Sequence, residues 1–183
     1  MKVIDISDDQ MGLNFDLVDK AKVKGCVVQV CEGTSLMDFY PRFFNACRAH
    51  RLSIGVSCVS LASDEEEAEE EAEALIKGIE RLGMMDTPLH LWIVFNEDVA
   101  DFMDSEMLAS IANTFISVCN ENDYLAGVCA DEWTLAAITE AGLNEGTVLW
   151  CTTPNSDIDR DIDCKRIGTE TIGAREINVN EFY

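Results

Sequence analysis

The sequence predicts an α/β fold, a parallel barrel that closes without its last helices. Five times along the chain, an apolar run with strand character is followed by a segment with helical periodicity. After residue 151 only strand-like segments follow. Alternating strands and helices build parallel sheets, and the last strands then have to complete the barrel on their own. In such barrels, the functional site lies at the carboxyl ends of the strands.

Strand and helix patterns follow one another in a regular order. The expected strands cover residues 3–6, 25–31, 52–59, 89–95, 125–130 and 148–151. The expected helices cover residues 15–21, 37–50, 64–82, 105–119 and 132–142. Phe15, Val18 and Ala21 share one face of the first helix, and Asn14 is a suitable cap. Pro41 lies near the start of the second helix, where proline is tolerated.

The third helix has the clearest pattern. Ser63 is expected as its N-cap, and Glu66 three residues later completes a capping box. Its apolar residues fall at helical spacing: Ala68, Ala72, Leu75, Ile76, Ile79 and Leu82. Residues 64–73 form an acidic run over the first turns, where negative charge suits the helix dipole. We interpret this run as a solvated face and not as a metal site. Gly83 is expected to end the helix.

The second half of the chain predicts one fully buried strand and, near its end, the strands that close the barrel. Residues 89–95 are apolar almost throughout, which is typical of a strand buried on both sides. Asp131 is expected to cap the fifth helix. Residues 152–163 are polar and loop-like, and two short strands are expected at residues 165–167 and 176–179.

Length and charge restrict the class of protein. The 183 residues suit one domain over residues 1–183, with a sizeable core. The net charge of -22 disfavours nucleic acid and anionic membranes as partners, and would hinder approach to a polyanionic cell wall. We interpret it mainly as a source of solubility. The sequence shows no transmembrane run and no signal peptide. We therefore expect a cytoplasmic protein or one exported by a signal-independent route, unless the chain is a mature fragment.

Eight cysteines occur, and none forms a CxxC pair. Most lie inside apolar strand or helix patterns, where a free cysteine behaves as a small hydrophobic residue. Reduced thiols are therefore expected, and no cofactor is predicted.

Short phrases in the same order along nearly the whole chain are similar to those of glycoside hydrolase family 25 lysozymes. Ile4-Asp5-Ile6-Ser7, with Gln10, Gly12 and Asn14-Phe15 after it, resembles that family's opening IDVS..QG.IDW. Further similar phrases lie at residues 27–35, 44–56, 91–93, 149–150 and 178–182. The resemblance implies an irregular (β/α)5(β)3 TIM-like barrel and hydrolysis of the glycan of peptidoglycan.

The resemblance also shows which carboxylates are missing. Glycosidic cleavage requires one acid to protonate the leaving oxygen and another group to stabilise or attack the anomeric carbon. The first family aspartate is matched by Asp5. The Asp-x-Glu of the fourth strand falls on Val94 and Asn96, and the closing aspartate falls on Asn178. Neither valine nor asparagine can act as a general acid near neutral pH.

Other site positions of the family are replaced as well. The Tyr-His of the third strand falls on Ser57 and Cys58, and the tyrosine of the fifth strand falls on Cys129. The Gln-Tyr that follows the sixth-strand tryptophan falls on Cys151 and Thr152. The resemblance therefore implies a pocket that lacks the family's sugar-stacking aromatic residues.

One alternative retains activity. A shift of two residues in the fourth strand keeps the inward face inward, and would put Asn96 and Asp98 at the Asp-x-Glu positions. An active peptidoglycan muramidase would then use Asp5 with Asp98, or with Glu32 as an unorthodox acid.

The resemblance places four thiols, Cys31, Cys58, Cys129 and Cys151, near the carboxyl ends of different strands. Four converging thiols would suit a soft metal such as zinc, and two close ones would suit a redox pair. We favour a third interpretation, in which small apolar groups fill a lost active site and no metal is bound, because no local chelate motif is present.

The leading functional hypothesis is therefore a degenerate, non-catalytic member kept as a binding or structural module. Its partner would be a glycan or another protein, for example in a phage particle or a secretion assembly. Outside this pocket, Trp133 near the start of the fifth helix is expected to pack against the protein and not to serve as a ligand platform.

Overall fold

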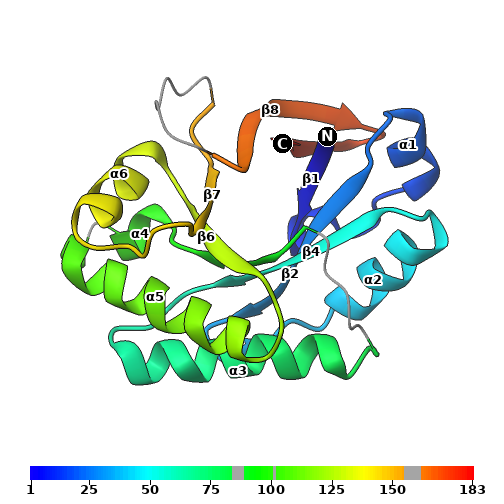
Figure 1. The fold of residues 1–183 in the computed structure, drawn as a ribbon. Coiled ribbons are helices and arrows are strands. Elements are labelled where there is room, and N and C mark those ends of the chain that lie inside the picture. Colours follow the sequence, from blue (N-terminus) through cyan, green and yellow to red (C-terminus); the bar gives the residue numbers. More distant parts are fainter. Residues whose placement is uncertain (84–88, 101, 155–161) are drawn as a thin grey trace.

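The computed structural model describes residues 1–83, 89–100, 102–154 and 162–183, without the side chains of Glu97 and Asp98. Within these ranges, eight strands close into a barrel with helices around it (Figure 1). The barrel strands are β1 (Lys2–Ile6), β2 (Gly25–Glu32), β4 (Ser53–Val59), β5 (Leu91–Val94), β6 (Ala126–Ala130), β7 (Val148–Cys151), β8 (Cys164–Ile172) and β9 (Arg175–Phe182). The helices are α1 (Phe15–Lys20), α2 (Tyr40–Ala49), α3 (Glu65–Glu80), α4 (Glu97–Ala100), α5 (Ser105–Glu121) and α6 (Glu132–Glu140). A short strand, β3 (Ser35–Leu36), and a 3-10 turn, η1 (Asp8–Gln10), complete the described elements.

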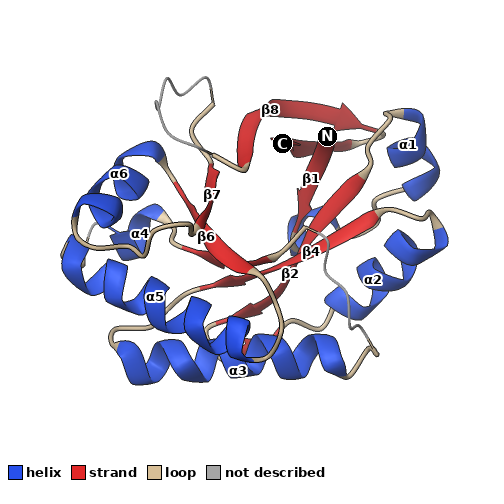
Figure 2. Cartoon of the chain, viewed as in Figure 1, coloured by secondary structure: helices blue, strands red, loops and turns tan. Residues whose placement is uncertain are grey.

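The strand order confirms the irregular (β/α)5(β)3 barrel. Strands β1, β2, β4, β5, β6, β7 and β8 pair in parallel, and the pairing of β1 with both β2 and β9 closes the barrel. Figure 2 shows the helices around the strands of this barrel. None of the helices in the described ranges is long and apolar enough to cross a membrane.

The closing strands differ from the expectation in length and direction. The two short strands expected after residue 164 are longer and form an antiparallel hairpin, paired from Cys164 with Phe182 to Ile172 with Arg175. Gly173 in the turn has a φ of +68°, which suits glycine. A tight turn joins antiparallel neighbours, so no crossover helix is needed and β9 returns beside β1.

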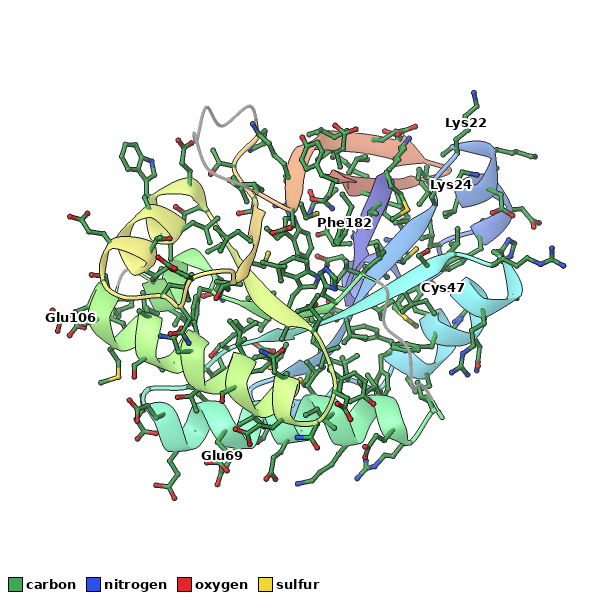
Figure 3. All side chains as sticks on the ribbon, viewed as in Figure 1. Lys22, Lys24, Cys47, Glu69, Glu106 and Phe182 are labelled. Carbon is green, nitrogen blue, oxygen red and sulfur yellow. The ribbon has the colours of Figure 1, made fainter. Side chains whose placement is uncertain are left out.

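Two cores hold the barrel. One lies between the strands and the helices, and includes the buried faces of α2, α3, α5 and α6. The other is built from Val3, Val27, Leu89, Trp92, Cys129, Trp150 and Cys164, with Phe182 packed against it (Figure 3). Trp92 and Trp150 meet edge to face with ring centroids 5.5 Å apart, and the Trp92 indole N–H donates to the Leu89 carbonyl at 2.7 Å. These rings fill the inside of the barrel with closely packed apolar groups.

The start of α3 is shifted by one residue from the predicted capping box. Its N-cap is Asp64, whose carboxylate accepts the Glu67 N–H at 3.0 Å. Ser63, the expected cap, donates its hydroxyl and its N–H to the Glu67 carboxylate, both at 2.7 Å. Asp64 therefore caps the helix, while Glu67 bonds back to Ser63, the residue before the cap, and the predicted capping box of Ser63 with Glu66 is not formed. Helix α2 also begins three residues late, because β3 pairs with β2 just before it.

The acidic run of α3 is not solvated throughout, contrary to the prediction. Glu71 is 2% exposed. Its carboxylate accepts the Ser60 hydroxyl and the Leu61 N–H, both at 2.7 Å. Burial raises the pKa of Glu71, and these hydrogen bonds offset only part of that rise. Glu71 thus fixes the loop between β4 and α3, whereas Glu69 on the same helix is exposed (Figure 3).

We predict that Glu71→Ala lowers the free energy of unfolding by about 2 kcal/mol or more, because it leaves two donors without their acceptor. Glu69→Ala, on the exposed face of the same helix, is the matched control and should change stability by about 0.5 kcal/mol or less. Urea unfolding followed by circular dichroism measures both values. Equal effects of the two variants would contradict the role given to Glu71.

We also predict a pH signature for Glu71→Gln. Because the folded-state pKa lies above the ordinary value, the folded protein takes up this proton before the unfolded chain does as the pH falls. The stability of wild type relative to the glutamine variant should therefore decrease as the pH rises from the ordinary glutamate pKa through the raised one. Unfolding curves of both proteins across this window measure the difference, and a pH-independent difference would refute the prediction.

Candidate functional site

The carboxyl ends of the strands surround a pocket of about 460 Å³. Most of its lining residues lie at every second position, as expected where alternate residues face the inside of a barrel, and Ile6 and Phe95 also border it. The paired positions are Asp5 and Ser7, Ser57 and Val59, Val94 and Asn96, Cys129 and Asp131, and Trp150 and Thr152. Gln29 from β2 and Arg166 from β8 complete its polar lining. The pocket therefore lies where barrel topology predicts a functional site.

Asp5 is the hydrogen-bonding centre of this pocket. Its Oδ1 accepts the side-chain amide of Asn180 at 2.8 Å. Its Oδ2 accepts the side-chain amide of Asn178 at 3.0 Å and the Arg166 guanidinium at 3.3 Å. All three donors come from the closing hairpin of β8 and β9. The Asp5 carboxylate thus links the first strand of the barrel to the last two.

A buried tryptophan extends this network into the barrel. Asn180 is fully buried, and its side-chain oxygen accepts the indole N–H of Trp150 at 3.2 Å. The same side chain donates its amide to Asp5, so its donor and its acceptor are both used. The orientation of Asp5 is therefore coupled to the packing of Trp150. Sequence reasoning identified Asp5 and Asn178, but it missed Arg166 and Asn180, which are distant in sequence from Asp5.

The second carboxylate of the pocket is Asp131, which the sequence identified only as a helix cap. It does cap α6: its Oδ1 accepts the N–H groups of Trp133 at 2.7 Å and Thr134 at 3.0 Å, and its Oδ2 accepts the Thr134 hydroxyl at 2.6 Å. Burial raises the pKa of Asp131, but these hydrogen bonds outweigh burial and hold the pKa below its ordinary value. A carboxylate held ionised in this way is a poor proton donor. Its position directly after a strand was the signal that it also borders the pocket.

The neutral residues that the resemblance aligned with acidic positions lie in the pocket lining or bond to it. Val94 and Asn96 line the pocket, and Asn178 donates to Asp5. The side-chain oxygen of Asn96 accepts the Val99 N–H at 3.0 Å, at the start of α4. The pocket wall around Asp5 therefore carries amide and hydroxyl groups, together with the Arg166 guanidinium.

The structure places the side chain of only one of the two unorthodox acids, Glu32. Asp98 falls in α4, beyond the end of β5, and its side chain is outside the described part of the structure. Glu32 was expected to be a pocket residue, but it is exposed and borders a separate hollow of about 240 Å³ beside Glu67 and Glu70. The register of β2 shifts between Gln29 and Cys31, so strict alternation ends before Glu32 is reached.

The four thiols do not converge on the pocket. Cys31 and Cys58 are register partners whose side chains lie in the core between the barrel and the helices, and Cys151 also belongs to that core. Cys129 lies inside the barrel and lines the pocket. Ser57 and Thr152 face the pocket, so their neighbours Cys58 and Cys151, expected as pocket residues, point outward.

The thiols pack as small apolar groups. All eight are free and buried. A hydrogen bond with the Cys31 thiol, together with burial, raises the pKa of Cys58, and burial raises the pKa of Cys119 to about 12. Among the residues that the structure describes, no group of three or more His, Cys, Asp or Glu side chains could hold a metal ion. The soft-metal site that would have required convergence of four thiols is therefore not formed.

Trp133 contradicts its predicted packing role. It lies in the first turn of α6, next to Asp131, and its side chain is 82% exposed. The helix itself was predicted correctly, but Trp133 lies on the helix face that points to solvent.

Comparison with known proteins supports this fold at low sequence identity. No protein-family model matches the sequence, and a search of curated proteins found no match. The autolysin LytC from Streptococcus pneumoniae, solved in complex with a synthetic peptidoglycan ligand, is 16% identical, with a TM-score of 0.85 over 100% of this chain. The chain spans 46% of the length of that LytC structure.

Two further solved structures are matched over most of their own length. The catalytic domain of endolysin ply40, from bacteriophage P40 of Listeria monocytogenes, has a TM-score of 0.81 at 15% identity, with 100% of this chain and 93% of that chain covered. A family 25 glycosyl hydrolase from Bacillus anthracis has a TM-score of 0.83 at 14% identity, with 100% and 88% covered. The chain therefore has the fold of glycoside hydrolase family 25 lysozymes and endolysins.

We predict that Asp5→Ala lowers the free energy of unfolding by about 2 kcal/mol or more, because three donors of the closing hairpin lose their acceptor. The effect should be smaller than for a fully buried ion pair, since the side chains of Asp5 and Arg166 are 24% and 21% exposed. Asp9→Ala, on the exposed η1 turn, is the matched control and should be close to neutral. Denaturant unfolding measures both, and wild-type stability of Asp5→Ala would contradict a structural role for this carboxylate.

Proposed function

We propose that this protein is a lysozyme-like barrel that binds a peptidoglycan-type glycan at the mouth of the barrel and does not cleave it. The observation that carries the proposal is the state of the two described carboxylates in the pocket. Asp5 accepts three hydrogen bonds from the closing hairpin, and Asp131 is held as the cap of α6. Both carboxylates are therefore engaged as hydrogen-bond acceptors within the protein.

The chemistry of glycoside hydrolysis explains why the state of these carboxylates matters. Most such enzymes use two carboxyl groups on either side of the glycosidic bond, one of which has a raised pKa and donates a proton. By the resemblance, that acid would lie at the positions of Val94 and Asn96. These two residues present an aliphatic group and an amide to the pocket. Substrate would meet hydrogen-bonding groups there, but no proton donor among the described side chains.

The same pocket has the chemistry of a carbohydrate-binding site. Gln29, Ser57, Asn96 and Thr152 contribute amides and hydroxyls, which can donate to and accept from sugar hydroxyls. Arg166 places a positive charge at the pocket of a chain whose net charge is -22. The similar LytC structure holds a synthetic peptidoglycan ligand, which supports a glycan of this class as the first ligand to test.

We predict that the purified protein sediments with peptidoglycan sacculi but does not clear a turbid suspension of them. Asp5→Asn and Asp98→Asn, the two substitutions that an acid-dependent mechanism would not tolerate, should leave the turbidity trace unchanged from that of wild type. An active family 25 lysozyme serves as the positive control for clearing. Reducing-sugar release from the same samples detects slow cleavage that turbidity would miss.

Two outcomes would overturn the proposal. Clearing by wild type that is lost in Asp98→Asn would establish a muramidase that uses the shifted acid. Absence of both clearing and sedimentation would exclude a peptidoglycan ligand and point to the protein-partner alternative, for which the same barrel mouth would be the first surface to test.

A further inference from the structure

Two aromatic side chains at the carboxyl end of the barrel are almost completely exposed. Phe102 is 90% exposed and Trp133 is 82% exposed. Phe102 lies between α4 and α5, in the connection that follows β5, and Trp133 lies in the first turn of α6, after β6. Strands β5 and β6 are neighbours, with Val94 paired to Cys129, and both of these residues line the pocket. The rim aromatics, Phe102 and Trp133, therefore both lie on connections that leave the carboxyl ends of adjacent strands.

The position of Trp133 relative to the pocket is well defined. Its backbone N–H donates to Asp131 at 2.7 Å, and Asp131 is itself a pocket residue. The N–H of the preceding residue, Glu132, donates to the Thr153 hydroxyl at 3.0 Å, which ties the start of α6 to the chain after β7. The indole is thus carried on a capped helix start that is anchored to two strand ends, and not on a free loop.

The exposure of Phe102 and Trp133 is informative because the strands before them end in a polar pocket. A single exposed apolar side chain is ordinary in a globular protein, but two large exposed aromatics on connections that follow adjacent strands of a polar pocket indicate an interaction surface. A sugar ring has an apolar face of C–H groups and an edge of hydroxyls. An aromatic ring suits the face, and the amides and hydroxyls of Gln29, Ser57 and Asn96 suit the edge.

We propose that the rim aromatics, Phe102 and Trp133, form a stacking surface for the sugar rings of a glycan chain that crosses the mouth of the barrel. This inference rests on the proposed function and specifies how the glycan is held. It also supplies exposed aromatic rings, whereas Trp150 in the pocket lining is buried. The occupant is a glycan and not an apolar protein segment, because the two strands that precede these aromatics end in a pocket lined by hydrogen-bonding groups.

The first experiment compares binding by variants that leave the pocket itself intact. The double substitution Phe102→Ala with Trp133→Ala should weaken sedimentation with peptidoglycan sacculi by about tenfold or more, as expected when an aromatic anchor is removed. Tyr183→Ala is the matched control. Tyr183 is an aromatic residue with 70% exposure, and it follows β9, whose end pairs with the start of β1 at the opposite end of the barrel. Binding by this control should equal that of wild type.

The second experiment uses the distribution of tryptophans. The chain has three: Trp92 and Trp150 are buried, so Trp133 alone is open to a soluble quencher. Acrylamide should quench the fluorescence of Trp133 in the free protein, and chitotetraose at saturating concentration should reduce that quenching. Trp133→Phe should lose the protected signal but keep most of its affinity for sacculi, because a flat aromatic ring remains.

The outcomes separate this inference from the proposed function. If wild type binds sacculi and the double variant binds equally well, the rim aromatics are not the stacking surface, although glycan binding stands. If wild type binds no glycan at all, the proposed function fails and this inference fails with it. Circular dichroism of each variant confirms that lost binding is not lost folding. Equal weakening by Tyr183→Ala would show nonspecific adhesion and would also overturn the inference.

Discussion

The seam at which the barrel closes is reinforced by the hydrogen bonds that Asp5 accepts from the last two strands. Each of the strands β1, β2, β4, β5, β6 and β7 is followed in the barrel by a parallel neighbour. Strands β8 and β9 instead form an antiparallel hairpin with no helix between them. Backbone pairing of β9 with β1 closes the ring, and Asn178, Asn180 and Arg166 add three side-chain bonds to one carboxylate at that seam. A charged acceptor makes these bonds stronger than neutral ones.

These hydrogen bonds give Asp5 a structural role. A carboxylate that accepts from two amides and a guanidinium is oriented by the hairpin, and through Asn180 it is coupled to the buried Trp150. The remaining pocket acid, Asp131, serves α6 in a comparable way. The mouth therefore keeps its shape and its hydrogen-bonding capacity while its acids stabilise the scaffold. This arrangement is the basis of the proposed function, recognition of a polar ligand without proton transfer to it.

Glu71 shows the same principle away from the pocket. The chain carries an excess of acids, and most of those on α3 face solvent, but this one is buried against the loop that follows β4. The Ser60 hydroxyl and the Leu61 N–H compensate part of the burial cost. The net charge of the protein thus says little about the structural role of an individual carboxylate. Asp5, Asp131 and Glu71 each hold a connection at the carboxyl end of the barrel.

The sequence by itself determined the elements and their class. Apolar periodicity predicted the alternating strands and helices, local capping chemistry identified Asn14 and Asp131, and the ordered phrases predicted the barrel and its neutral residues at Val94 and Asn96. These features are encoded within a few neighbouring residues, where hydrogen-bonding patterns and side-chain period are the same in any protein.

Only the tertiary structure decided which side chains meet. A register shift in β2 places Cys31 beside Cys58 in the outer core, so the thiols that looked convergent lie in different layers. The antiparallel return of β9 brings Asn180 to Asp5 across almost the whole chain. Burial of Glu71 and exposure of Trp133 depend likewise on which helix face meets the barrel. The direction in which a side chain points and the register of a strand are set by partners that are distant in sequence. A local sequence pattern carries no information about those partners.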